Sequence, residues 1–269
     1  MLKTYLSRLL RVSGLIFFSD KLHFVYQLII NRKKNYSFKI ENPSFLLPPS
    51  YILYEAYQMD HSKYHQDGLD TAKWLCNQIS NFKELKNVNI LDWGCGPARV
   101  LRHLPTILNE SCTLYGTDYN NATINWCKKN LDHINFSING LNPPLNYPDA
   151  EFDIVYGISI FTHLSEEMHF AWMVELSRIL KNGGILFLTT QGEVFRLKLT
   201  AKELGCFDNG NLVVRGRTKE GHRTFSAFQP ESFMRKLFGG FEVLHYTKGE
   251  IKNNKPSQDL WIVKKIEKQ

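Results

Sequence analysis

Val88-Asn-Ile-Leu-Asp-Trp-Gly-Cys-Gly-Pro-Ala-Arg-Val100 is the stretch that decides the fold of this chain. An apolar run ends at Asp92, and Gly94 and Gly96 follow before residues that can begin a helix. Glycine has no Cβ, so it can adopt a positive φ and leave room for a ligand beside the backbone. Asp92 would repel a pyrophosphate but can bind a cation or a hydroxyl group. The stretch therefore predicts a strand–loop–helix unit for a positively charged cofactor that carries a nucleoside.

Short β-rich runs and helical segments alternate along the chain. The runs that predict strands cover residues 88–91, 113–117, 134–138, 152–156 and 185–190. The helical segments between them cover residues 99–108, 122–131 and 166–180. Two later apolar runs, 241–246 and 260–263, predict a closing pair of strands. Such alternation predicts an α/β fold with a doubly wound, mostly parallel, seven-stranded sheet and right-handed crossovers.

Spacing and helix-breaking residues predict further details of these helices. Pro105 is expected to end or kink the helix over 99–108. Residues 182–184, Asn-Gly-Gly, are expected to cap the helix over 166–180. The residues expected on or near the buried face of that helix are Phe170, Val174, Leu176 and Leu180.

The division of the chain is predicted from its prolines. Three prolines within residues 42–50 oppose both helix and strand, so we place a boundary there. Residues 1–50 are predicted to form an N-terminal helical, amphipathic extension. Residues 51–269 are predicted to form the main domain, with 193–230 as an insertion on the substrate side. The main domain is expected to begin with a helical segment over 51–82 that breaks near Gly68.

The N-terminal extension contains two apolar pieces, residues 15–18 and 22–30, which Asp20 and Lys21 separate. Neither piece approaches the ~20 apolar residues that span a bilayer, and no cleavage pattern of a signal peptide follows them. Two alternatives stay open. The segment packs on the domain through an apolar face, or it lies on a membrane surface with its aromatic residues inserted. The cations that would then face anionic headgroups are Arg8, Arg11, Lys21, Arg32, Lys33 and Lys34.

Composition and charge are those of a globular protein. Of the 269 residues, 43% are hydrophobic and 22% are charged, and the net charge is +7. A basic protein can bind nucleic acid, anionic lipid or an acidic substrate. The five cysteines are odd in number and form no C-x-x-C pair, which argues against a disulfide framework and a metal site. We predict a cytoplasmic protein with reduced thiols, or one peripheral to the inner face of the membrane.

Candidate ligand-binding residues follow three successive predicted strands. Gly94 and Gly96 follow the first strand, Asp118 ends the second, and Asn139 follows the third. In a doubly wound sheet, ligands bind beyond the carboxyl ends of strands where the strand order reverses. The Asp118 carboxylate can accept hydrogen bonds from both hydroxyls of a ribose, and the Asn139 amide can pair with an adenine edge. Together these residues predict a site for an adenosyl group.

These motifs resemble the class I S-adenosylmethionine-dependent methyltransferases. The matching segments are Leu91-Asp-Trp-Gly-Cys-Gly96, Tyr115-Gly-Thr-Asp118, Phe152-Asp-Ile-Val-Tyr-Gly157 and Leu180-Lys-Asn-Gly-Gly-Ile-Leu186. The later segments Gly221-His-Arg-Thr-Phe225 and Gln258-Asp-Leu-Trp261 resemble features of a bacterial, largely uncharacterised subgroup of them. The resemblance implies a Rossmann-like methyltransferase fold with S-adenosyl-L-methionine as the cofactor. It implies that Asp92, Gly94 and Gly96 hold the methionine portion and Asp118 the ribose. The other cofactor-binding residues that it implies are Tyr119, then Asn139, Gly140 and Leu141 at the adenine, and Gly157 and Ile158 near the sulfonium.

The glycine-rich turn departs from two patterns. Ala98 stands where the methyltransferase family often has a third glycine, and we expect a slightly altered turn without loss of binding. An NAD-binding turn needs its third glycine where Arg99 stands. Hydride transfer is therefore disfavoured.

Two histidines are candidate catalytic bases. Methyl transfer is an in-line displacement in which positioning does much of the work, and a base helps when the acceptor is an alcohol. His163 follows the fourth predicted strand and His222 lies in a later loop, and the ordinary pKa of histidine suits proton transfer near neutral pH. The alternative for His163 is that it only orients the helix that begins near Ser165. Arg223 is either a clamp for an anionic acceptor or a surface residue.

The sequence thus predicts a methyltransferase that most readily methylates oxygen on a small-molecule, saccharide or lipid-linked acceptor. A nucleic-acid methyltransferase is the second hypothesis, because the protein is basic, but no Asn-Pro-Pro-Tyr-type motif follows the fourth strand. A non-catalytic S-adenosylmethionine-binding scaffold is the third. The expected partner is a small-molecule or glycan-type acceptor, with membrane contact through the N-terminal segment left open.

Overall fold

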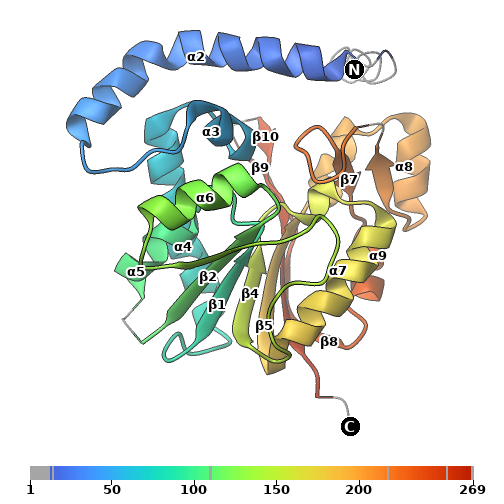
Figure 1. The fold of residues 1–269 in the computed structure, drawn as a ribbon. Helices are drawn as coiled ribbons and strands as arrows, with labels where there is room; N and C mark the ends of the chain where they lie inside the picture. The colour runs from blue at the N-terminus through green and yellow to red at the C-terminus, as the bar shows by residue number, and fades with distance from the viewer. Residues whose placement is uncertain (1–12, 14, 109–110, 217, 253, 268–269) are drawn as a thin grey trace.

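The computed structural model describes residues 13, 15–108, 111–216, 218–252 and 254–267 (Figure 1). Of the N-terminal cations named above, Arg8 and Arg11 lie outside the described residues. A twisted sheet lies at the centre of the molecule, with helices on both faces and one long helix across the top (Figure 1).

The central sheet has seven strands in the order β3-β2-β1-β4-β5-β11-β8. Their bounds are β1 Asn89–Trp93, β2 Thr113–Asp118, β3 Asn135–Ile138, β4 Phe152–Gly157, β5 Leu180–Thr190, β8 Phe241–Thr247 and β11 Asp259–Lys265. Strand β11 runs antiparallel to both of its neighbours, while the pairs among β1 to β5 are parallel. The strand order reverses between β1 and β4. The predicted doubly wound, mostly parallel seven-stranded sheet is confirmed.

Both faces of this sheet are buried, because successive residues of a strand point to opposite sides. Ile90 and Ile154 belong to a core under the helices that cover one face, and their neighbours Leu91 and Val155 belong to the core on the other face. The first face is covered by α4 His61–Ser80, α5 Leu104–Ile107 and α6 Asn121–Asn130, and the second by α7 Glu166–Ile179 and α9 Glu231–Leu237 (Figure 1). Burial on both sides explains why the strand sequences are nearly continuous apolar runs.

Helix α7 differs from the prediction in its buried face and its end. Phe170 is 37% exposed and Val174 is 73% exposed, so placing them on or near the buried face was wrong. The helix begins after Ser165, whose hydroxyl accepts the Met168 N–H, and this start sets which face is turned inward. The helix ends at Ile179 and β5 begins at once, so residues 182–184 do not cap it. The buried residues are Met168, His169, Trp172, Met173, Glu175, Leu176 and Ile179.

The segment over 99–108 is also shorter than predicted. A 3₁₀ turn, Leu101–His103, precedes α5, and Pro105 lies in the first turn of α5 rather than at its end. Proline costs little there because the first N–H groups of a helix have no partner within the helix.

The predicted helical segment over 51–82 is two helices, α3 Ser50–Ala56 and α4. The break lies at residues 57–60, where the Asp60 carboxylate accepts the Lys63 N–H and caps α4. The predicted break at Gly68 was wrong, since α4 continues through it. Gly68 is buried in α4, and a Cβ there would lie 2.4 Å from the Arg99 carbonyl oxygen. Glycine is present because the glycine-rich turn approaches the helix closely.

Replacing Gly68 with alanine should therefore destabilise the protein. Alanine in a helix interior ordinarily stabilises by about 1 kcal/mol relative to glycine, but a clash with backbone in a packed core costs about 1–3 kcal/mol. We expect Gly68→Ala to lower the free energy of unfolding, measured with urea. Gly205→Ala is the matched control, because Gly205 lies in helix α8 Ala201–Asp208 with no atom within 4 Å of its Cβ position. It should be neutral or stabilising; a Gly68→Ala protein as stable as this control would contradict the packing argument.

Helix α2, Ile16–Glu41, lies across the top of the molecule above α3 (Figure 1). Its inner face packs on the domain, with Phe24 and Leu28 against a cluster that contains Leu53 and Tyr54. Asp20 of α2 forms an ion pair with Arg223 at 2.9 Å. The described part of the chain has no helix long and apolar enough to cross a bilayer. The predicted division at residue 50 stays a prediction, and so does a membrane role for the segment.

The segment 193–230 interrupts the alternation between β5 and α9. It holds a 3₁₀ turn Glu193–Lys198, helix α8 and the antiparallel pair β6 Val213–Arg215 and β7 Ser226–Phe228. Phe195, Phe207 and Phe228 give it a small core of its own. A second short pair, β9 Ile251–Lys252 with β10 Lys255–Pro256, joins β8 to β11.

Candidate cofactor-binding and active site

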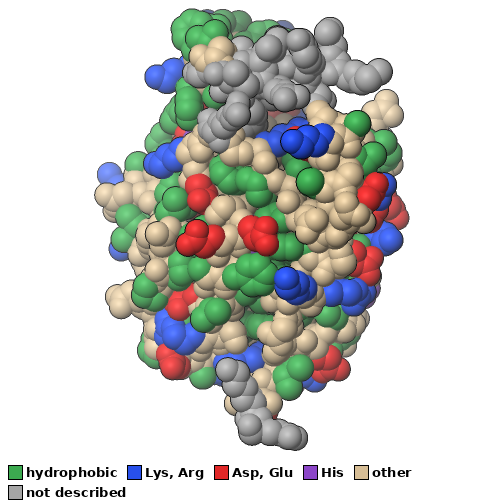
Figure 2. Space-filling model, turned by 90° about the vertical axis from the view of Figure 1, so that its right-hand side faces the viewer, with side chains coloured by type: hydrophobic (Ala, Val, Ile, Leu, Met, Phe, Trp, Pro, Cys, Tyr) green, Lys and Arg blue, Asp and Glu red, His purple; other side chains and the backbone are tan. Residues whose placement is uncertain are grey.

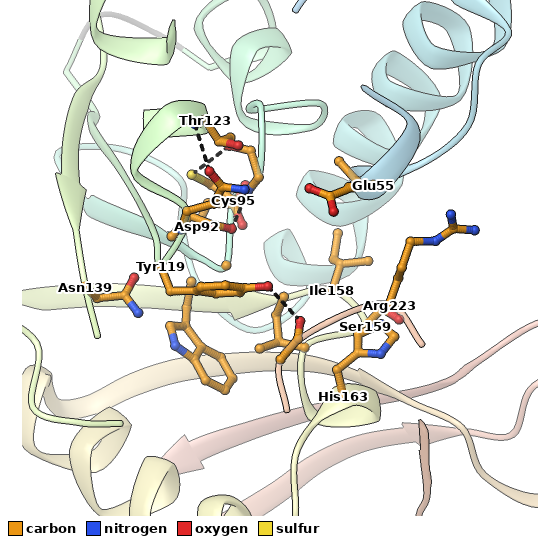
Figure 3. Close-up of a pocket in the computed structure, with 18 of the residues that line it drawn as sticks. Glu55, Asp92, Cys95, Tyr119, Thr123, Asn139, Ile158, Ser159, His163 and Arg223 are labelled. Carbon is orange, nitrogen blue, oxygen red and sulfur yellow. Dashed lines mark hydrogen bonds between the residues drawn. The ribbon is translucent and has the colours of Figure 1, made fainter. Parts of the chain in front are cut away.

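A cavity of about 250 Å³ lies beyond the carboxyl ends of β1, β2 and β4, where the strand order reverses (Figure 3). Its walls come from four parts of the chain: helix α3, the glycine-rich turn after β1, the ends of β2 to β4, and the segment that carries Gly221. The lining residues used below are Glu55, Asp92, Gly94, Gly96, Asp118, Tyr119, Asn139, Gly140, Leu141, Ile158, Ser159, His163, Gly221, His222 and Arg223.

The turn after β1 is built from residues with positive φ. Gly94 has a φ of 75° and Gly96 of 50°. A Cβ on Gly94 would lie 2.2 Å from the side chain of Ile160, so only glycine fits there. Ala98 has a φ of 56°, so the turn keeps a left-handed residue at the position where glycine was expected, at a cost of about 1 kcal/mol. The N–H groups of Gly94 and Cys95 both donate to the Thr117 carbonyl, which ties the turn to β2.

Asp92 places a buried carboxyl group in the wall of this cavity. Burial raises its pKa to about 7, although the neighbouring Tyr156 hydroxyl and the Arg99 guanidinium oppose the shift. Tyr156 lies beside it, fully buried, and its hydroxyl has no hydrogen-bond partner of good geometry among the described residues. A carboxylate held out of water is stabilised by a cation that enters the cavity. A ligand with an ammonium group would supply such a cation.

Asp118 is held rigidly at the end of β2. One carboxylate oxygen accepts the Gly96 N–H at 3.0 Å and the other accepts the Asn120 N–H at 2.8 Å. Burial raises the pKa of this carboxyl, and the two backbone donors oppose the rise. Each oxygen accepts one of these N–H groups and keeps a second lone pair. The side chain is thus oriented and can still accept two hydroxyl donors.

Residues after β3 and β2 form the next part of the wall. The Asn139 amide oxygen accepts from the Thr117 hydroxyl at 2.8 Å, and the Leu141 carbonyl accepts from the Trp172 indole N–H at 3.1 Å. These bonds fix the short segment 139–141. The Tyr119 ring extends into the cavity, and its hydroxyl donates to the Gly221 carbonyl at 3.1 Å (Figure 3). Burial raises the pKa of Tyr119 to about 12, so this hydroxyl keeps its proton.

His163 and His222 both line the cavity, but they differ in how many of their ring nitrogens have a hydrogen-bond partner. The His163 Nδ1 lies 2.8 Å from the Phe225 carbonyl oxygen, which can only accept, so Nδ1 carries the proton. The Nε2 of the neutral ring then has a free lone pair. Burial lowers the pKa of His163, although the Phe225 carbonyl opposes the shift, so the ring is neutral at pH 7. This is the state that a general base needs.

Both ring nitrogens of His222 are engaged. Its Nδ1 accepts the Thr224 N–H at 3.2 Å, so the proton of the neutral ring is on Nε2, which lies 3.4 Å from a Glu55 carboxylate oxygen. The hydrogen bond with His222 lowers the pKa of Glu55. His222 is thus tied to its neighbours and has no free lone pair. The geometry favours His163 over His222 as the proton acceptor.

Comparison with known proteins agrees with this fold. A methyltransferase from Methanosarcina mazei superposes with a TM-score of 0.57 at 20% identity, over 71% of this chain and 98% of its own. A magnesium protoporphyrin IX methyltransferase from Synechocystis, solved with bound S-adenosylhomocysteine, gives 0.54 at 14% identity, over 89% and 99%. A Pyrococcus horikoshii protein gives 0.57 at 16% identity, over 82% and 100%. At these identities the similarity shows the fold.

Residues 90–184, which carry the glycine-rich turn and the ends of β2 to β4, match the protein-family profile described as a methyltransferase domain. The chain carries a methyltransferase domain of the class I S-adenosylmethionine-dependent type. It is therefore an enzyme of the transferase class, with S-adenosyl-L-methionine as its cofactor. The match covers the predicted cofactor side of the cavity and leaves out helix α3 and the segment with Gly221.

The structure of this methyltransferase brings most of the predicted site residues to one cavity. Gly157 is the exception, because it lies behind the wall, where a Cβ would meet the Trp93 ring at 2.8 Å. Sequence reasoning missed Glu55, which lines the cavity from α3 (Figure 3). The one sequence signal for it was an acidic residue within an otherwise apolar and aromatic turn of helix.

Proposed function

We propose that this methyltransferase transfers the cofactor's methyl group to an oxygen atom of a small-molecule, saccharide or lipid-linked acceptor. The cofactor supplies an activated methyl group, and the protein binds, orients and deprotonates. The observation that carries the proposal is the His163 ring. The residue lines the cavity, its neutral ring holds the Nδ1 proton against the Phe225 carbonyl, and its Nε2 keeps the lone pair that would accept the acceptor's proton. A hydroxyl acceptor needs such a base, whereas a neutral amine does not.

The charges and polar groups on the cofactor side of the cavity suit S-adenosylmethionine. In this proposal the buried Asp92 carboxylate faces the ammonium group and the Asp118 oxygens accept the ribose hydroxyls. The segment 139–141 borders the adenine, and Tyr119 and Ile158 complete the pocket. Gly94 and Gly96 leave the space that a side chain would fill.

The opposite wall is polar and is the proposed acceptor side. Glu55, His222 and Arg223 line it, and Arg223 also stacks on the Tyr54 ring at 4.1 Å. A wall of paired charges offers both donors and acceptors, which suits a hydroxylated acceptor such as a saccharide. The segment 193–230 supplies two of these three residues, in line with the predicted substrate-side insertion.

The ribose assignment makes a binding prediction. Asp118→Ala should weaken S-adenosylmethionine binding by about 5- to 150-fold, or about 1–3 kcal/mol, because two ribose hydroxyls lose their acceptor. Titration calorimetry measures this directly, and Asp132→Ala, at a fully exposed side chain, is the matched control. An unchanged affinity in Asp118→Ala would remove the assignment. The wild-type protein should bind S-adenosylmethionine and not NAD.

The acceptor is identified by incubating the protein with methyl-labelled S-adenosylmethionine and fractionated cell extract. The proposal expects label on an oxygen of a small or lipid-linked molecule, located by mass spectrometry. Label that appears only in nucleic acid or on nitrogen would contradict it.

A further inference from the structure

The outer face of helix α2 carries an apolar stripe that no described part of the chain covers. Its residues are three, four or seven positions apart, so they share one side of the helix, with Arg32 and Lys33 at the longest gap. Their exposed fractions range from 50% to 69%. We call this set the outer stripe, and it consists of Phe18, Leu22, Val25, Ile29, Tyr36 and Ile40.

The outer stripe lies opposite the face by which α2 packs on the domain. The inward side chains include Phe24, Leu28 and Phe38, which is buried, and Asp20, which pairs with Arg223. A helix that is apolar on both sides is normally covered on both sides. An apolar patch of this kind marks a binding surface. By contrast, the exposed Val174 and Leu197 lie on two separate elements outside α2. Figure 2 shows some hydrophobic side chains at the upper edge of the molecule, beside the grey atoms.

The charges along α2 indicate which kind of partner covers the outer stripe. Four exposed cations of α2 lie beside it, namely Lys21, Arg32, Lys33 and Lys39, whereas Lys34 pairs with Asp60 of the domain. Along α2, which is described throughout, the acidic residues are Asp20, which points inward to Arg223, and Glu41 at the last position. A second copy docked stripe to stripe would set cations against cations in either direction. Anionic lipid headgroups complement both the cations and the apolar side chains.

We propose that α2 docks this methyltransferase on an anionic membrane surface, with the outer stripe in the headgroup region and the helix parallel to the bilayer. The 26 residues of α2 span about 39 Å, which provides a long contact without crossing the bilayer. Tyr26 and Tyr36 are exposed on or beside the stripe, and their amphipathic rings suit the headgroup level.

Docking would also place the acceptor side of the cavity near the membrane. Phe17 of α2 lies 5.7 Å, centroid to centroid, from the His222 ring, and Asp20 holds Arg223. His222 and Arg223 both line the cavity. If the proposed function holds, this arrangement favours a lipid-linked acceptor over a freely diffusing one; the docking itself does not depend on that function.

Vesicle co-sedimentation of the full chain tests the proposal. We expect the protein to pellet with vesicles of phosphatidylcholine and phosphatidylglycerol, to bind phosphatidylcholine alone weakly, and to be released by salt. Leu22→Ser with Ile29→Ser should lower the partition coefficient at least tenfold. Arg32→Gln with Lys33→Gln should lower it by about fivefold for each charge. The matched controls are Val174→Ser with Leu197→Ser for the stripe, and Lys248→Gln with Lys252→Gln for the cations; both should bind as the wild type does.

Three results would overturn the proposal. The wild-type protein could stay in the supernatant with anionic vesicles. The stripe variant could bind vesicles as tightly as its control, which would place the contact elsewhere. A dimer in sedimentation equilibrium that the stripe variant abolishes would identify a second copy as the occupant. Urea unfolding and S-adenosylmethionine titration of each variant should match the wild type, which separates a failure of docking from a failure of the cofactor site.

Discussion

Replacing His163 with glutamine should lower the rate of methyl transfer by a factor of about 10²–10⁴, the range that a positioned general base contributes. The cofactor affinity should not change, because the ring stands at the proposed acceptor side and the Asp92 and Asp118 carboxylates are untouched. Single-turnover transfer from labelled S-adenosylmethionine into the active extract fraction measures the rate, and calorimetry measures the affinity. At saturating cofactor, the wild-type rate should fall only below the pH range in which an unperturbed histidine titrates. Burial lowers the pKa of His163, so the base is protonated only there.

Two controls separate catalysis from structure in this experiment. His133→Gln makes the same change at a half-exposed side chain far from the cavity and should leave the rate unchanged. His222→Gln should cost less than tenfold and act through KM, because His222 has no free lone pair for the acceptor's proton. Nitrogen NMR of the free protein should find the His163 proton on Nδ1, a readout that needs no acceptor. A His163→Gln enzyme with the wild-type rate would mean that the acceptor needs no base, and the oxygen proposal would fail.

The cofactor side of the site was predictable because its determinants are local in sequence. Asp92, Gly94 and Gly96 lie within five residues of one another, and Asp118 directly ends an apolar strand. Once the alternation fixes a parallel sheet, the topology brings these strand ends to one edge. Ala98 shows what a motif cannot predict. The residue is not the expected glycine, yet its backbone has the left-handed φ of 56° that a glycine would adopt there.

The acceptor side could not be predicted, since it depends on contacts between distant segments. Arg223 forms an ion pair with Asp20, which lies 203 positions away in the chain. His222, in a loop, contacts the Glu55 carboxylate of α3. Neither pair has a sequence pattern. The errors on α7 and Gly68 have a related cause. Apolar spacing does not tell which of two faces is covered, and a glycine in a helix can mark a close neighbour instead of a break.

Replacing Asp92 with asparagine should stabilise the cofactor-free protein and weaken cofactor binding at the same time. The pKa of Asp92 is about 7 in the folded state and 3.8 in a model peptide. The folded state therefore binds more protons between about pH 4 and pH 7, and this carboxyl makes stability fall as the pH rises through that window. At pH 8 the ionised, buried group costs up to about 4 kcal/mol. Asp92→Asn removes that cost, and urea unfolding at pH 8 should show the gain.

The gain in the free energy of unfolding from Asp92→Asn should shrink by roughly half at pH 5, because the wild-type carboxyl is then protonated in the folded state. Asp153→Asn is the control of opposite sign. Burial alone would raise the pKa of Asp153, but the Lys181 ammonium and the Asn89 N–H outweigh it and lower the pKa. That carboxylate therefore stabilises the fold above its unfolded pKa, and its replacement should destabilise the protein at pH 8.

Asp92 thus links the stability of the free enzyme to the charge of its cofactor. An ammonium group beside the carboxylate favours ionisation, so binding should release protons near pH 7, and affinity should fall as the pH drops from 8 to 6. Calorimetry in two buffers of different ionisation enthalpy detects such a release. Equal affinity at both pH values without proton release, or an Asp92→Asn protein no more stable than the wild type at pH 8, would show that this carboxyl is not the cofactor's counter-charge. The ionised, buried Asp92 costs stability in the cofactor-free protein because it is held out of water, and the cofactor's ammonium group would offset that cost on binding.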